Sequence, residues 1–208
     1  MIKAAIKQAE PKIPLEFSFV FSGRNSGISE DFKHFWEEHC DYFHEEINSY
    51  GTCHTEDFID TPSPETPHNR NRPEILPAAL ARDCSGEIIG VVYVTFSEID
   101  VSFLLGSHCY YQSMYIKKEC RKTNPFRLVH PLYQTFLKGF LSEDCQRDCR
   151  AKYLLSKNVN PDLHRPASKR YFERVGFRTL GKHSDGFETW ILPLEASVRK
   201  QNNTINSS

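Results

Sequence analysis

The spacing of apolar residues along this 208-residue chain switches repeatedly between the period of a strand and the period of a helix. Residues 15–21 (LEFSFVF) alternate apolar and polar side chains, as a strand with one buried face does. Residues 29–48 begin with Ser29 as a helix N-cap and then carry apolar side chains at helical spacing, with acidic residues opposite. This alternation restricts the fold to a mixed sheet covered by helices.

The rest of the chain continues the same alternation. A hairpin is predicted from strands at 76–82 and 88–96, joined by the turn sequence Cys84-Ser-Gly-Glu. The remaining predicted elements are a strand at 110–116, a helix at 125–141, a strand at 151–157, a helix at 166–175 that Gly176 stops, and strands at 177–182 and 187–192. The predicted order is β-α-ββ-β-α-β-α-ββ.

This order predicts one α/β domain at residues 15–194, with an N-terminal extension at 1–14 and a disordered polar tail at 195–208. We expect a mixed sheet of six or seven strands with helices on both faces. Residues 51–77 are rich in Thr, Pro and Asn, which predicts a long loop.

Charge and composition narrow the class of protein. Lys and Arg number 26 against 27 Asp and Glu, so we expect neither nucleic acid nor an anionic membrane as a partner. No apolar run approaches the about 20 residues of a membrane span, and residues 1–12 lack the apolar stretch of a signal peptide. The seven cysteines form no CxxC pair, which indicates reduced thiols in a cytoplasmic protein.

Two groups of cysteine, histidine and acidic side chains do not form a predicted binding site. Cys145 and Cys149 could share a helical face, but no further ligand follows at zinc spacing, so we expect no metal site. The polar residues of the first helix lie at mixed angles and predict a solvated face; they are His34, Glu38, His39 and His44.

The segment from Ile116 to Phe177 carries the most specific signal. Its strand, loop and helix at 114–141 and its ending Tyr171-Phe-Glu-Arg-Val-Gly-Phe177 resemble the GNAT acyltransferases, whose last helix ends in a YEKLGF-like stretch. The resemblance covers residues 76–194 and, by order of elements only, 15–48. It implies an enzyme that moves an acetyl or longer acyl group from a thioester, acyl-CoA first, to an amine acceptor. It also implies that strands 111–116 and 151–157 are parallel neighbours that diverge at one end.

The resemblance places the donor on the strand 111–116. Backbone groups of Met114, Tyr115 and Ile116 would bind the amide-bearing arm of the donor, and an N–H near Tyr115 would face the oxyanion. Acyl-CoA would act as a substrate, with no permanently bound cofactor.

The loop after this strand departs from the pattern of the family. The family places Arg/Gln-x-x-Gly-x-Gly/Ala there, whereas Lys122, Asn124 and Phe126 occupy the glycine-type positions. Asn124 would cap the next helix, whose N-terminus would face the phosphates. The side chains expected to bind phosphate are Arg121, Lys122 and Arg127. The alternative is a solvated basic loop.

The acid and the base of the reaction are less clearly marked. The resemblance implies a tyrosine acid in the last helix, but Phe172 occupies that position, so the candidate is Tyr171, turned by about 100°. The candidate bases are Glu98, Asp100 and His108, which flank the central strands.

Two alternatives stay open. Acyl-carrier-protein-dependent relatives, such as N-acyl amino acid synthases and homoserine-lactone synthases, also lack a clean glycine loop, and the basic stretch 117–127 would suit an acidic carrier protein. The second alternative is a non-catalytic binding protein that has kept the fold. It is supported by the lack of a general base on the strand 110–116 and by Phe172 at the position of the acid. The sequence leaves the acceptor, the acyl length and the oligomeric state open.

Overall fold

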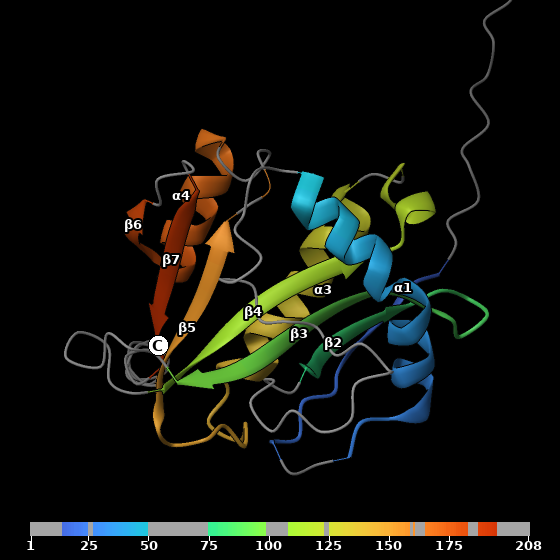
Figure 1. Cartoon of the computed structure of the whole chain (residues 1–208), viewed down its shortest axis with the longest axis horizontal. Coiled ribbons are helices and arrows are strands. Elements are labelled where there is room, and N and C mark those ends of the chain that lie inside the picture. The colour runs from blue at the N-terminus through green and yellow to red at the C-terminus, as the bar shows by residue number, and fades with distance from the viewer. Residues whose placement is uncertain are drawn as a thin grey trace, which may run out of the picture.

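A computed structural model describes residues 14–24, 27–49, 75–98, 108–122, 125–158, 160, 165–182 and 187–194 (Figure 1). The elements in chain order are β1 (Glu16–Phe19), α1 (Glu30–Ser49), β2 (Ile75–Arg82), β3 (Ile88–Glu98), β4 (His108–Ile116), the 3-10 helix η1 (Lys118–Lys122), α3 (Pro125–Phe140), β5 (Ala151–Asn158), α4 (Pro166–Val175), β6 (Arg178–Lys182) and β7 (Glu188–Pro193). The predicted order is confirmed, with η1 added. The predicted terminal extension and tail and most of the predicted long loop lie outside the described residues.

The strands form one seven-stranded sheet in the order β1-β2-β3-β4-β5-β7-β6. β4 and β5 pair in parallel, and every other neighbouring pair is antiparallel. The parallel pair joined through helix α3 is the one that the sequence predicts. The mixed sheet of six or seven strands is therefore confirmed.

Helices cover both faces of the sheet, as predicted. Figure 1 shows α1 in front of β2, β3 and β4, with α3 and α4 behind the sheet. Alternate residues of β3 serve the two faces: Val91 packs with the aromatic side chains of α1, and Val92 packs with Leu132 and Phe136 of α3. These three elements, β3, α1 and α3, bury apolar surface against one another, and a fully buried aliphatic or aromatic side chain contributes about 1.5–3 kcal/mol.

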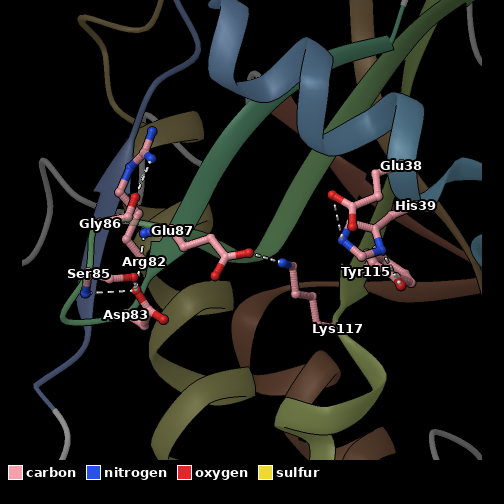
Figure 2. Close-up of polar contacts among 9 residues, drawn as sticks. All are labelled: Glu38, His39, Arg82, Asp83, Ser85, Gly86, Glu87, Tyr115 and Lys117. Carbon is pink, nitrogen blue, oxygen red and sulfur yellow. Dashed lines mark hydrogen bonds and ion pairs between the residues drawn. The ribbon is translucent and has the colours of Figure 1, made fainter.

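The turn between β2 and β3 is fixed by one carboxylate. Asp83 Oδ1 accepts hydrogen bonds from the Ser85 N–H at 2.9 Å, the Ser85 hydroxyl at 2.6 Å and the Glu87 N–H at 3.1 Å (Figure 2). Gly86 has a φ of 85°, which suits a glycine. The predicted hairpin turn is confirmed, and it sets the position of Glu87, which contacts the candidate site.

The prediction for the polar side chains of α1 is wrong at His39. His34 and Glu38 are exposed, but His39 is only 8% exposed and packs against Phe35 and Tyr115. His39 lies four residues after Phe35 and four before Phe43, so helical geometry puts it on the apolar stripe.

Cys145 and Cys149 share no helical face, because α3 ends at Phe140 and residues 141–150 belong to no helix. Both thiols are free. Within the described residues, no helix combines the length and the apolar stretch needed to cross a membrane.

Candidate functional site

β4 and β5 are paired over only the first part of β4. The parallel register runs from His108↔Ala151 to Tyr111↔Leu155, whereas β4 continues along β3 to Ile116 and β5 continues along β7 to Asn158. The two strands diverge beyond Tyr111 (Figure 1). The predicted splay is confirmed, and it creates an opening inside the sheet.

The register with β3 decides which backbone groups line this opening. The Lys117 N–H donates to the Ile89 carbonyl at 3.0 Å, and the β3–β4 register has no shift along β4. Because antiparallel residues alternate in direction, odd-numbered residues of β4 turn their N–H and C=O groups to β3. Met114 and Ile116 therefore turn theirs to the opening, beyond the last pair with β5. Tyr115, between them, turns its backbone to β3.

A group of polar side chains lies where the strands separate. Gln112 is 7% exposed, and its Nε2 donates to the Tyr133 hydroxyl of α3 at 2.7 Å. The ring of Tyr133 lies 6.3 Å from the ring of Tyr171 on α4. Gln112 and Tyr133 stand on the β4 side of the opening, and Tyr171 stands on the helix that follows β5. The opening is thus bordered by hydroxyl and carboxamide groups on the α3–α4 face.

Tyr171 and Phe172 occupy different surroundings, as the one-residue offset predicts. Phe172 is buried among Tyr133, Phe177 and Trp190, with ring centroids 5.5–5.8 Å away. Tyr171 instead lies against α3, with its ring 5.4 Å from that of His130. Burial raises the pKa of Tyr171, and the nearby Gln134 side chain partly offsets this. Tyr171 is therefore protonated at neutral pH.

The segment after β4 is a 3-10 helix and not an open loop. The Cys120 N–H in η1 donates to the Lys117 carbonyl at 2.9 Å, so this backbone donor is already used. The tight turn of η1 needs no glycine, because a 3-10 helix has ordinary negative φ values.

Two cations of this segment, Arg121 and Lys117, already have anionic partners. Arg121 donates to both carboxylate oxygens of Glu46 on α1, at 2.5 and 2.6 Å, and its Nε donates to the Ile116 carbonyl at 2.7 Å. Lys117 pairs with Glu87 of the hairpin turn (Figure 2). Burial opposes the charge of Lys117, but the Glu87 pair outweighs it and raises the pKa of this lysine.

The other predicted phosphate ligands are placed in part. Arg127 is exposed in the first turn of α3, where a phosphate could reach it. The backbone of Lys122 ends η1, and its side chain lies outside what the structure describes, as does the whole of Asn124.

Two of the candidate bases, His108 and Glu98, belong to residues at the paired end of β4. His108 pairs with Glu98 across β3 and with Ala151 across β5, and its ring stacks on Phe96 at 5.1 Å. Six residues, about 20 Å of strand, separate it from Met114. The side chain of Glu98 and all of Asp100 are outside the described residues. The structure therefore does not bring His108 to the opening together with Tyr171.

A polar cluster on the α1 face of the sheet was not predicted from the sequence; it consists of Glu38, His39 and Tyr115. His39 Nδ1 lies 3.5 Å from the Tyr115 hydroxyl, and His39 Nε2 lies 4.0 Å from the Glu38 carboxylate (Figure 2). Burial and then the Lys117 ammonium lower the pKa of His39, so its ring is neutral at pH 7. The spacing from Phe35 to Phe43 was the signal for its burial.

No family model matches the chain, and no curated protein matches it in sequence. Among solved structures, FeeM, an N-acyl amino acid synthase from uncultured soil microbes, matches with a TM-score of 0.50 at 11% identity, over 89% of this chain and 93% of that chain.

Two acetyltransferase structures also match, with lower scores. A GNAT superfamily phosphinothricin acetyltransferase from Sinorhizobium meliloti, in complex with AcCoA, has a TM-score of 0.46 at 12% identity, over 86% of this chain and 88% of that chain. A GNAT-family acetyltransferase from Staphylococcus aureus Mu50 has a TM-score of 0.44 at 11% identity, over 87% and 99%. Together with the splayed parallel pair, the match to the synthase shows that this chain shares the fold of that N-acyl amino acid synthase.

Proposed function

We propose that this protein is an N-acyltransferase that moves an acyl group from a pantetheine thioester to an amine. The observation that carries the proposal is the run of backbone beyond Tyr111, where β4 has left β5 and Met114 turns its N–H and C=O to the opening. An extended arm that contains amides can pair with such an edge as a strand does.

The chemistry needs few groups. A neutral amine would attack the thioester carbonyl and form a carbon–nitrogen bond, and the Met114 N–H would donate to the resulting oxyanion. The carbon–sulfur bond then breaks, the thiolate leaves, and the nitrogen loses a proton to solvent. Tyr171, protonated and half-buried on α4, would give its proton to the thiolate.

Two donors present the same pantetheine arm. Acyl-CoA adds a pyrophosphate, for which Arg127 and the start of α3 remain as ligands. An acyl-carrier protein is the second candidate, because η1 and the Arg121–Glu46 pair leave less cationic surface for a pyrophosphate than the sequence predicts. The fold shared with an N-acyl amino acid synthase makes amino acids the first acceptors to test.

The experiment that tests the proposal is transfer by a Met114→Pro variant, followed by mass spectrometry of the acylated amine. Proline removes one N–H, and at this position the N–H faces the opening and not the β3 ladder. We expect a loss of about 10²–10³-fold in kcat, the usual effect of removing one oxyanion donor. Met114→Ala, which keeps the N–H, should stay close to wild type.

Two results would contradict this. A Met114→Pro protein that folds and transfers at the wild-type rate would remove Met114 from the reaction. A wild-type protein that transfers nothing from acyl-CoA or acyl-carrier donors, across an amine panel that includes amino acids, would favour the non-catalytic binding protein.

A further inference from the structure

Positive charge gathers on the outer side of α4 and on the edge strand that follows it. The cations are Arg165, Lys169, Arg170 and Arg174 in and just before α4, and Lys182 at the end of β6. The acidic residues described among them are Glu173 on α4 and Glu188 on β7, and Glu188 is already paired with Lys169. The whole chain has a net charge of -1, so this positive excess is local. We call this surface the basic face of α4.

The register of β6 places Lys182 on the same side of the sheet as α4. Lys182 lies opposite Glu188 in the β6–β7 pair, and Glu188 accepts a hydrogen bond from the Lys169 ammonium of α4 at 2.7 Å. Directly opposed residues of an antiparallel pair project to the same face of the sheet. The basic face therefore extends from the helix to the edge strand.

Two arginines of α4 point to solvent. Phe172 is buried in the core, whereas Arg170 and Arg174 are exposed and line a surface hollow together with Glu173. Among the described residues, no carboxylate forms an ion pair with either arginine. An external anion can therefore bind them without breaking an internal pair, in contrast to Arg121 of η1, which is held by Glu46.

The basic face begins beside the opening between β4 and β5. These strands are parallel, α3 follows β4 and α4 follows β5, so both helices begin at the edge of the sheet where the strands have diverged. Figure 1 shows both helices on one side of the sheet. Arg127 is exposed in the first turn of α3, Arg165 is the N-cap residue of α4, and Tyr171 lies on α4 itself. The cations and the proposed acid thus share one helix.

The extent of the basic face selects the kind of partner. The 10 residues of α4 span about 15 Å, and Lys182 lies beyond them on β6. The phosphates of a coenzyme would reach cations near the start of the helices, whereas an acidic protein surface can contact cations along the whole face. A phosphopantetheine arm is roughly 16 Å long by ordinary bond lengths, so a protein bound here can reach the opening with it.

We propose that the basic face of α4 docks the acidic surface of an acyl-carrier protein, which delivers its thioester arm into the opening. This inference rests on the proposed function and names the macromolecule that presents the arm. It also moves the docking surface from the stretch 117–127, which the sequence suggests for this role, to the outer side of α4. Arg127 is the cation of that stretch that lies beside the new surface.

The test compares two donors that carry the same acyl group on the same arm, an acyl-carrier protein and S-acylpantetheine. The wild type should favour the carrier protein by about tenfold or more in kcat/KM at low salt, the usual gain from electrostatic attraction. Arg170→Glu should remove this preference, because like charges would then face each other across the interface. Arg170→Lys keeps the charge and should keep most of the preference.

Lys138→Glu is the matched control. It makes the same change of charge at an exposed position in the last turn of α3, the end of that helix away from the opening, and it should keep the wild-type preference. Salt gives a second readout, since raising it from about 0.1 M to about 1 M shortens the Debye length from about 10 Å to about 3 Å. Transfer from the carrier protein should weaken, whereas transfer from the uncharged S-acylpantetheine should change little.

A carrier preference that neither Arg170→Glu nor salt reduces would overturn the inference. If Arg170→Glu does not fold, Arg170→Gln takes its place. Transfer from S-acylpantetheine with no preference for the carrier protein would overturn the inference and leave the proposed function standing. Binding of a double-stranded DNA fragment through Arg170, with carrier transfer unaffected by Arg170→Glu, would assign the face to nucleic acid and overturn it too. Transfer from neither donor would overturn both.

Discussion

At the scale of single residues, the proposed catalytic acid is Tyr171, and the packing of α4 decides where its hydroxyl lies. Phe172 fills the core between Tyr133 and Trp190, and the next position around α4 turns Tyr171 to His130. Adjacent helical residues point about 100° apart, so the two rings cannot exchange roles without rotating the helix. Tyr171 is the hydroxyl that α4 brings to α3.

Tyr171→Phe tests its role as the acid. We expect the transfer rate to fall by about 10²–10⁴-fold, the usual contribution of a positioned acid, while the donor Kd changes little. Single-turnover kinetics with a saturating donor separate the two quantities. An unchanged rate would mean that the thiolate leaves without help and that Tyr171 is structural.

His39 shows how burial changes a side chain that sequence alone assigns to solvent. Its ring contacts Phe35 and Tyr115, and burial with the nearby Lys117 lowers its pKa. In the unfolded chain the pKa is about 6.5, so between that value and the lower folded value the unfolded state binds more protons. The stability that neutral His39 allows is present above pH 6.5 and is lost as the pH falls through the folded pKa.

Urea unfolding of His39→Phe at several pH values measures this effect. The wild type should lose stability from pH 8 to pH 5, with a slope of at most about 1.4 kcal/mol per pH unit for one group. His39→Phe should flatten the slope but not remove it, because burial lowers the pKa of His44 too. His34→Phe is the matched control at an exposed position and should keep the wild-type slope. A wild-type slope in His39→Phe would contradict the account.

At the scale of elements, one ion pair joins the first helix to the segment after β4. Arg121 of η1 binds Glu46 of α1 through two hydrogen bonds and also holds the Ile116 carbonyl at the end of β4. Any phosphate that binds Arg121 must therefore compete with a carboxylate from α1.

Glu46→Gln tests this competition. Removing the carboxylate should strengthen binding of a phosphate-bearing donor by about 3–10-fold at low salt and steepen its salt dependence, since a charge-assisted bond contributes about 1.5–3 kcal/mol in full. Glu45→Gln changes the net charge equally at an exposed neighbouring position and should have little effect. Coenzyme A binding that ignores salt, Glu46→Gln and Arg121→Ala would remove Arg121 from the donor site.

The elements differ in how well sequence predicts them. The strands and helices follow apolar periodicity, and α4 ends where Gly176 adopts a φ of 109°, so local chemistry was sufficient there. The 3-10 helix and its ion pairs were not predictable, because Glu46 lies 75 positions from Arg121 and no local pattern pairs them. The burial of His39 can be predicted from its spacing to Phe35 and Phe43. Its contact with Tyr115 cannot, because that contact depends on how α1 packs on the sheet.

At the scale of the whole molecule, the sheet defines the site by where its pairing stops. All of β4 pairs with β3, and β5 pairs with β7 from Tyr153 to Asn158. Where β4 and β5 diverge, each strand is therefore still paired along its other edge. The order of elements predicts this topology. The direction in which Met114 turns its backbone N–H and C=O does not follow from the order of elements. It follows from the residue register between β4 and β3.

The proposed function requires that the backbone of β4 beyond Tyr111 binds the thioester arm. The most direct measurement is amide hydrogen exchange at Met114, by NMR, with and without saturating S-acetylpantetheine. We expect the ligand to slow exchange of the Met114 N–H by about tenfold or more, corresponding to one new hydrogen bond. Exchange of the Tyr115 N–H, which is directed at β3, should change little. Unchanged exchange at Met114 in a protein that has bound the ligand would contradict the proposed function.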